Sequence, residues 1–195
     1  MKFIVGLLLG LLVVPFGVYL YFTGGSAPVA ITDSDIPFEN FFAHKALNAR
    51  IAKDMPKTVP LPATEANDLA GAELYQQHCA VCHGLPMAPK TAIALGMYPR
   101  PPQLFQGKGV TDDEPGETYW KIFNGIRLTG MPGFSKSLSE TQMWQVALLL
   151  ANADKLPASA KAALVAAGTP AASVPPATAA PVFPTAVPSS VPSPK

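Results

Sequence analysis

The sequence predicts an all-α chain with an apolar amino-terminal helix, a helical domain and an irregular carboxy-terminal tail. An uninterrupted apolar stretch opens the chain, four later segments are predicted to be helices, and a Pro/Ala-rich stretch closes it. The 195 residues carry a formal net charge of +1 and 14% charged residues. That composition fits one domain of ordinary size with extensions, and it argues against a basic surface of the kind that binds nucleic acid.

The first predicted element is the charge-free stretch over residues 3–22. At a rise of about 1.5 Å per residue, a helix of this length spans the roughly 30 Å of a hydrocarbon core. A cleaved signal peptide is the alternative, but its apolar region is usually only about 7–15 residues long. Pro28 also follows the best small-residue cleavage site. We therefore expect residues 1–23 to form a transmembrane anchor, with Lys2 on the cytoplasmic side.

Residues 24–65 are predicted to link this anchor to the rest of the chain. A Gly/Ser/Pro stretch precedes a helix over residues 38–54, which Pro56 ends. The spacing of its apolar residues favours one continuous apolar side. This side is expected to contain Phe38, Phe41, Phe42, Leu47 and Ile51. The prolines after this helix favour an extended connection.

The next helix, predicted over residues 68–78, leads into the sequence Cys-Ala-Val-Cys-His. Two cysteines separated by two residues and followed by histidine are the attachment signature of a c-type haem. The thiols of Cys79 and Cys82 can each add to one haem vinyl group, and His83 can then bind the iron. A thioredoxin-like dithiol is the alternative, but it has no role for the histidine. A structural zinc would need about four ligands, and the chain has no other cysteine.

Residues 84–113 lose helical periodicity. Five prolines exclude a long helix or a central strand. They are Pro86, Pro89, Pro99, Pro101 and Pro102. A loop of about 30 residues would usually count against an assignment. Here a large rigid cofactor supplies the surface on which the loop packs, and a short helical turn is expected at residues 91–96.

A further helix is predicted over residues 115–124, with a proline in its first turn and Gly125 after its end. Its bulky side chains can cover a face or an edge of the porphyrin, and packing in the core is their alternative role. These side chains are Tyr119, Trp120, Ile122 and Phe123.

The sequence Gly-Met-Pro-Gly at residues 130–133 offers a second iron ligand. The thioether of Met131 is a soft ligand that can complete six-coordinate haem iron. The flanking glycines leave room for the porphyrin, and the proline stiffens the loop. Met97 is the main rival, because it lies 14 residues after His83 in the proline-rich loop. The less suitable internal methionines are Met55, Met87 and Met143.

The last helix of the domain is predicted over residues 139–152, opened by the capping box Ser-Glu-Thr-Gln. The domain is then expected to cover residues 66–156. Residues 157–195 are assigned to an Ala/Pro-rich tail. An alanine-rich turn of helix is expected after Pro157, up to Ala167 and ended by Gly168, and residues 169–195 cannot build a core. This tail is either a disordered spacer or a strap on a partner subunit.

Three stretches of the chain occur in a specific order and spacing. They are GAELYQQHCAVCHG at residues 71–84, YPRPPQL at 98–104 and NGIRLTGMP at 124–132. Together they resemble a class I c-type cytochrome domain, with the membrane-anchored bacterial monohaem members as the nearest likeness. The resemblance covers about residues 66–155. It implies an all-α fold in which the helix before the haem motif crosses the last helix near Gly71, Tyr75 and Trp144.

The same resemblance implies one covalently bound haem c. It implies His83 and Met131 as axial iron ligands. It also implies that a carbonyl of the Pro101-Pro102 pair accepts a hydrogen bond from the ring N–H of His83. The candidate haem-binding residues are Cys79 and Cys82 for covalent attachment, His83 and Met131 for the iron, and Pro101, Pro102, Tyr119, Trp120 and Arg127 in the pocket.

Six-coordinate iron leaves no open position for a substrate, so these ligands favour one-electron transfer over catalysis. We expect a non-enzymatic electron carrier in the bacterial inner membrane, with its haem domain on the periplasmic side. Its expected partners are redox proteins, met either as a shuttle or as a subunit of a respiratory or photosynthetic complex. A haem enzyme or gas sensor with a labile sixth ligand is the alternative, although no catalytic acid or base constellation stands out.

Overall fold

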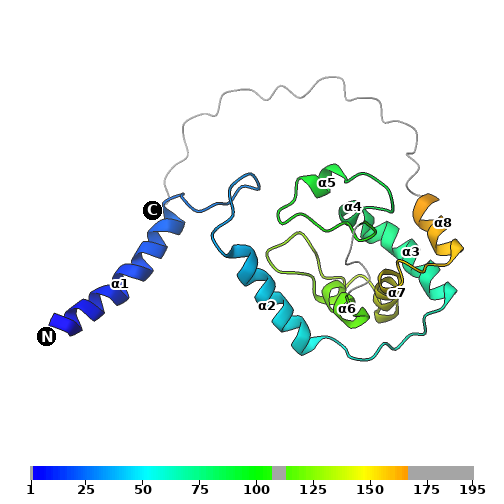
Figure 1. Cartoon of the computed structure of the whole chain (residues 1–195), viewed down its shortest axis with the longest axis horizontal. Coiled ribbons are helices and arrows are strands. Elements are labelled where there is room, and N and C mark those ends of the chain that lie inside the picture. Colours follow the sequence, from blue (N-terminus) through cyan, green and yellow to red (C-terminus); the bar gives the residue numbers. More distant parts are fainter. Residues whose placement is uncertain (1, 107–112, 167–195) are drawn as a thin grey trace, which may run out of the picture.

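The structure is a computed structural model that describes residues 2–106 and 113–166. All regular secondary structure in these ranges is helical, as predicted (Figure 1). The helices are α1 (Lys2–Thr23), α2 (Glu39–Asp54), α3 (Glu65–His78), α4 (Ala80–His83), α5 (Ala92–Leu95), α6 (Pro115–Asn124), α7 (Glu140–Ala151) and α8 (Ala158–Ala166). The predicted tail lies outside the described residues from position 167 onward.

Helix α7 is the centre of the core, and α3 and α6 pack on it. Its start is fixed by the predicted capping box. The Ser139 hydroxyl accepts a hydrogen bond from the backbone N–H of Gln142 at 3.3 Å, and the Gln142 side chain accepts one from the Ser139 N–H at 2.8 Å. On the α6 side, Tyr119 stacks on Trp144 with ring centroids 4.3 Å apart. These contacts place aromatic packing at the middle of the domain.

Helix α3 crosses α7 at Gly71, as the cytochrome resemblance implied. A methyl group at Gly71 would lie 2.8 Å from the carbonyl carbon of Gln145 and 3.1 Å from Cβ of Leu149. Only glycine lets the two backbones approach this closely. The crossing fixes the direction of α3 and therefore the position of the haem motif that follows it.

The domain extends beyond its predicted end at residue 156. Helix α8 packs against α3, and Ala160 and Leu164 are 0% and 1% exposed in the same core as α7. Ser159 also donates a hydrogen bond to Glu65 at 2.6 Å. The helix expected after Pro157 is present as α8, and it packs in the core with α3 and α7. The alanine-rich composition of this segment did not reveal that Ala160 and Leu164 are buried in the core.

Helix α2 joins the domain through one side only. Ile51 is 2% exposed and α2 contacts α6, whereas Phe41 and Phe42 are largely exposed. The prediction that Leu47 and Ile51 continue the phenylalanine side was wrong. Leu47 follows Phe42 by five residues, and at about 100° per residue this places the two side chains roughly 140° apart.

Helix α1 stands apart from the other helices (Figure 1). It is long and apolar enough to cross a membrane, and none of its apolar window is buried inside the structure. Pro15 lies within it, and membrane helices tolerate proline at such positions. Its bounds agree with the predicted apolar span.

Candidate haem-binding site

The haem motif begins where α3 ends. Cys79 is the residue between α3 and α4, and its carbonyl accepts hydrogen bonds from the backbone N–H groups of Cys82 and His83 at 3.1 and 2.9 Å. This single turn fixes the spacing of the two cysteines. Both are free and half-buried. Burial, reinforced by the nearby Cys82, raises the pKa of the Cys79 thiol to about 12, so that thiol remains protonated at neutral pH.

The imidazole of His83 is held through one of its two nitrogens. Nδ1 lies 2.8 Å from the carbonyl oxygen of Pro102. A carbonyl only accepts, so Nδ1 carries the proton and Nε2 keeps a free lone pair. Of the two prolines proposed for this role, Pro102 makes the contact. Burial lowers the pKa of His83, and the bond to Pro102 opposes this only in part, which favours the neutral ring that a metal requires.

The segment after the two prolines is tied to the haem motif by further hydrogen bonds. The backbone N–H of Leu104 donates to the carbonyl of His83, and the side-chain amide of Gln103 donates to the carbonyl of Cys82, both at 3.3 Å. Gly84 has a φ of 73°, and a methyl group there would collide with the Gln103 side chain. Sequence reasoning missed Gln103, although its position directly after Pro102 was the available signal.

Tyr75 links α3 to the residue after the motif. Its hydroxyl is buried and donates to the carbonyl of Gly84 at 2.8 Å, while its ring meets Phe105 edge-on at 5.0 Å. Burial raises the pKa of Tyr75, so the hydroxyl remains a donor at neutral pH. On the other side of the motif, the Thr91 hydroxyl donates to the carbonyl of Val81 at 2.6 Å.

Hydrogen bonds within the loop hold the backbone of Met131. The carbonyl of Met131 accepts from the N–H of Ile126 at 3.1 Å, and the N–H of Met131 donates to the Thr129 hydroxyl at 3.1 Å. That hydroxyl donates to the carbonyl of Ile126 at 2.7 Å. These bonds close the loop and fix the backbone of Met131.

Two glycines let this loop pack directly on the end of α6. Gly125 has a φ of 68°, and a methyl group there would lie 2.6 Å from the carbonyl carbon of Pro132. A methyl group at Gly133 would lie 2.7 Å from the carbonyl oxygen of Asn124. Both contacts exclude a larger residue, so the end of α6 also positions the loop.

Met97 reaches the same loop from the proline-rich segment. Its terminal methyl group contacts the position that a side chain at Gly130 would occupy. The two methionines considered as iron ligands therefore belong to neighbouring segments. The sequence did not indicate this proximity, because 33 residues separate Met97 from Gly130.

The remaining candidate pocket residues fall in different environments. Tyr119 is buried and its described contacts are with the core, including the stack on Trp144. Trp120 is half-buried and Arg127 is exposed. The other two histidines are both exposed: His78 faces Phe134, and His44 bonds to the carbonyl of Asn40 at 2.7 Å.

The donor groups of this site fit a c-type haem. Cys79 and Cys82 are free thiols at the spacing that thioether attachment needs, and His83 presents an unprotonated Nε2. Its second nitrogen already has a backbone partner, which is the usual support of a metal-binding histidine. Met131 adds a thioether on a fixed loop.

A comparison with known protein families agrees with this fit. Residues 66–150 match the family described as cytochrome c oxidase, cbb3-type, subunit III. A chain of the Kuenenia stuttgartiensis reducing HAO-like protein complex is 26% identical, with 48% of this chain and 46% of that chain covered and a TM-score of 0.42. The match spans less than half the length of that chain. No curated protein matches significantly. Residues 66–150 form a cytochrome c domain.

Proposed function

We propose that this chain is a membrane-anchored monohaem c-type cytochrome that transfers single electrons between redox partners on the extracytoplasmic side of a membrane. A cytochrome c domain implies covalently bound haem and electron transfer. The observation that carries the residue-level proposal is the hydrogen bond from His83 Nδ1 to Pro102. It leaves the other ring nitrogen free in the form that binds iron.

In this proposal each residue of the site has one role. Cys79 and Cys82 would attach the haem through thioethers, and His83 and Met131 would bind its iron. When bound, the haem supplies the one-electron change between ferrous and ferric iron. The Pro102 carbonyl fixes the tautomer and orientation of His83 and increases its basicity. The thioether of Met131 favours the reduced state and hence a relatively high potential.

The proposed location follows from α1 and from the cofactor. Helix α1 serves as an uncleaved anchor, and c-type cytochromes are extracytoplasmic. The partners we propose are redox proteins of a membrane respiratory or photosynthetic complex. The family description names an oxidase subunit, which supports a respiratory complex first.

A redox titration with visible spectra tests the electron-carrier function. The detergent-purified protein should show one reversible one-electron transition and no binding of carbon monoxide unless a ligand is displaced. A five-coordinate resting spectrum would instead support the haem enzyme or gas sensor. Haem that stays with the polypeptide under denaturing conditions would support the thioethers, and haem extracted by acidified organic solvent would contradict them.

Amino-terminal sequencing of the mature protein tests the anchor. A chain that keeps residues 3–22 and stays with membranes after carbonate washing is the expected result. A mature chain that begins near Pro28 in the soluble extracytoplasmic fraction would show that α1 is a signal peptide. Co-purification from mild detergent then separates a fixed subunit from a mobile shuttle.

A further inference from the structure

Three phenylalanines form an exposed cluster at the start of α2. Phe38, Phe41 and Phe42 are 73%, 60% and 65% exposed. Their rings contact one another: Phe42 meets Phe38 edge-on at 6.5 Å and Phe41 edge-on at 5.2 Å. Single exposed apolar residues are common, but three touching aromatic rings on one helix turn indicate a surface that another phase or molecule covers.

The backbone conformation of Phe38 is unusual for a phenylalanine. Phe38 has a φ of 66°, the left-handed region that a bulky residue seldom adopts. The backbone N–H of the next residue donates to Ile36, and the Glu39 side chain accepts from the Ile36 N–H at 3.0 Å. Strained backbone conformations of this kind cluster at functional sites, so the exposed ring of Phe38 favours a role in binding.

Lysines share the face of α2 that carries the aromatic cluster. At about 100° per residue, Lys45 and Lys53 lie within roughly 60° of Phe42 around the helix. Both are exposed. Glu39 lies as far from Phe42 around the helix as Lys45 does, but its carboxylate bonds to the preceding turn, and Asp54 is paired with Arg50. An aromatic cluster flanked by lysines is the composition of a helix that lies in a membrane interface.

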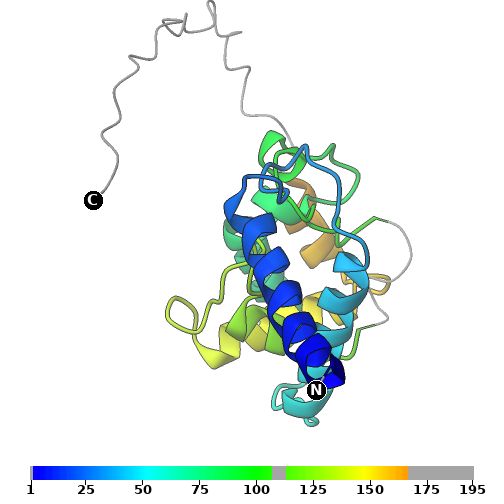
Figure 2. The same ribbon diagram turned by 90° about the vertical axis from the view of Figure 1, so that its left-hand side faces the viewer.

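The rest of α2 is oriented so that this face points away from the haem domain. Ile51 lies about 180° around the helix from Phe42 and is buried on the domain side. Figure 1 shows α2 between α1 and the domain helices, running crosswise to α1 from near the end at which α1 would leave the membrane. Figure 2, seen from the α1 side, shows α1 in front of α2 and the domain.

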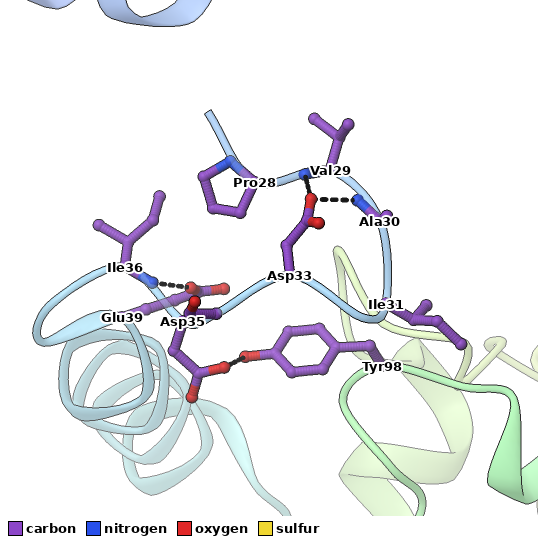
Figure 3. Close-up of a pocket in the computed structure, with 10 residues that line it drawn as sticks. Pro28, Val29, Ala30, Ile31, Asp33, Asp35, Ile36, Glu39 and Tyr98 are labelled. Carbon is purple, nitrogen blue, oxygen red and sulfur yellow. Dashed lines mark hydrogen bonds between the residues drawn. The ribbon is translucent and has the colours of Figure 1, made fainter. Parts of the chain in front are cut away.

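The segment between α1 and α2 is folded and fastened to the haem domain. The Asp33 carboxylate accepts from the backbone N–H groups of Val29 and Ala30, both at 2.8 Å, and the Tyr98 hydroxyl donates to Asp35 at 2.7 Å (Figure 3). The bond to Asp35 raises the pKa of Tyr98 to about 12, so the hydroxyl remains a donor at neutral pH. The connection is therefore short and ordered, and it keeps the aromatic end of α2 near the anchor.

We propose that the face of α2 formed by Phe38, Phe41, Phe42, Lys45 and Lys53 lies on the surface of the membrane that α1 crosses. The phenyl rings enter the headgroup boundary, roughly 5–10 Å deep, and the lysines contact anionic lipid. The inference rests on the proposed membrane anchor. Its consequence is that α2 sets the height and orientation of the haem domain above the bilayer.

Labelling of the full-length holoprotein in vesicles tests this contact. With Cys79 and Cys82 attached to haem, a cysteine introduced as Ala49→Cys is the only free thiol. Ala49 is exposed and lies about 20° from Phe42 around α2. A fluorophore there is compared with one at Glu73→Cys, an exposed position on α3. Vesicles contain phosphatidylethanolamine with or without phosphatidylglycerol, and nitroxide lipids serve as quenchers.

The expected result is quenching at position 49 and none at position 73. Quenching at position 49 should be lost in Phe41→Ser/Phe42→Ser and reduced in Lys45→Glu/Lys53→Glu or without phosphatidylglycerol. Val165→Ser, at a position 60% exposed on α8 and outside the haem site, is the matched control and should keep full quenching. An unchanged visible spectrum in detergent confirms that each variant is folded.

Failure of this contact and failure of the anchor give different results. A chain that remains in carbonate-washed vesicles but shows equal quenching at positions 49 and 73 would overturn the contact and leave the anchor intact. A chain that washes off would overturn the anchor and the contact with it. Cross-linking between two copies at position 49, without lipid quenching, would identify a second copy as the occupant and would also overturn the proposal.

Discussion

At the scale of single residues, Met131 and Met97 compete for one role in the haem site. Met131→Ala should abolish the weak long-wavelength absorption band of sulfur-bound ferric haem, because it removes the sulfur that we propose as the iron ligand. Met131→His should retain haem but lower the reduction potential, since imidazole favours ferric iron more than sulfur does. Met97→Ala is the matched control and should keep both band and potential. If Met97→Ala loses them and Met131→Ala does not, Met97 is the ligand.

The buried carboxyl of Asp68 gives a prediction about pH and stability. Asp68 is 7% exposed, and its Oδ1 has no hydrogen-bond partner among the residues that the structure describes. Burial raises the pKa of Asp68, and Asn152 opposes only part of the rise. The folded state therefore prefers the protonated acid, and stability is lost as the pH rises from the unfolded-state pKa of about 3.9 through the raised folded-state value.

Asp68→Asn removes this charge without changing the shape of the side chain. At about pH 7 it should raise the free energy of unfolding by on the order of 1 kcal/mol, and near pH 3 the gain should vanish because wild-type Asp68 is then protonated. Thermal unfolding across this range is the measurement. Glu73→Gln, at an exposed acid on the same helix, is the control and should have little effect. A gain that persists at low pH would contradict the assignment.

At the scale of elements, the crossing of α3 and α7 depends on Gly71. Gly71→Ala would force the backbones apart, because its methyl group would lie 2.8 Å from the carbonyl carbon of Gln145. Such overpacking should lower the free energy of unfolding by about 1–3 kcal/mol. At Gly96 the nearest atom to an added methyl group is the Ala92 carbonyl oxygen at 3.4 Å. Gly96→Ala should therefore stay within about 0.5 kcal/mol in the same denaturant titration.

The elements that the sequence predicted well are those with local signals. The capping box at Ser139 and the proline and glycine that bound α6 act within a few residues, and the structure has these helices where they were expected. The single apolar side predicted for α2 was wrong, because exposed phenylalanines and buried Ile51 have the same apolar character in a sequence. The contact of Met97 with Gly130 and the bond from Gln103 to Cys82 were missed, because both depend on how distant segments meet.

At the scale of the whole molecule, the domain is closed by a helix that lies beyond the matched cytochrome residues. Leu164 of α8 is 1% exposed, and the Gln76 side chain of α3 donates a hydrogen bond to the carbonyl of Ala163. The sequence predicted a short alanine-rich helix here but grouped it with the tail, since alanine is common in both helices and spacers. The fold instead uses the small side chains of α8 to approach α3 closely, so the stability of the haem-bearing helix depends on residues near the end of the described chain.

Leu164→Ala tests this dependence. Removal of a buried leucine side chain should lower the free energy of unfolding by about 2–5 kcal/mol. Val165 is the next residue and is 60% exposed, so Val165→Ala should cost no more than about 0.5 kcal/mol. Both variants are unfolded in denaturant while haem absorbance and helical circular dichroism are followed together. Because α8 packs on α3, the two signals should shift together in Leu164→Ala. If Leu164→Ala and Val165→Ala have the same free energy of unfolding, α8 does not stabilise the domain. The domain would then end at residue 156, as predicted from the sequence.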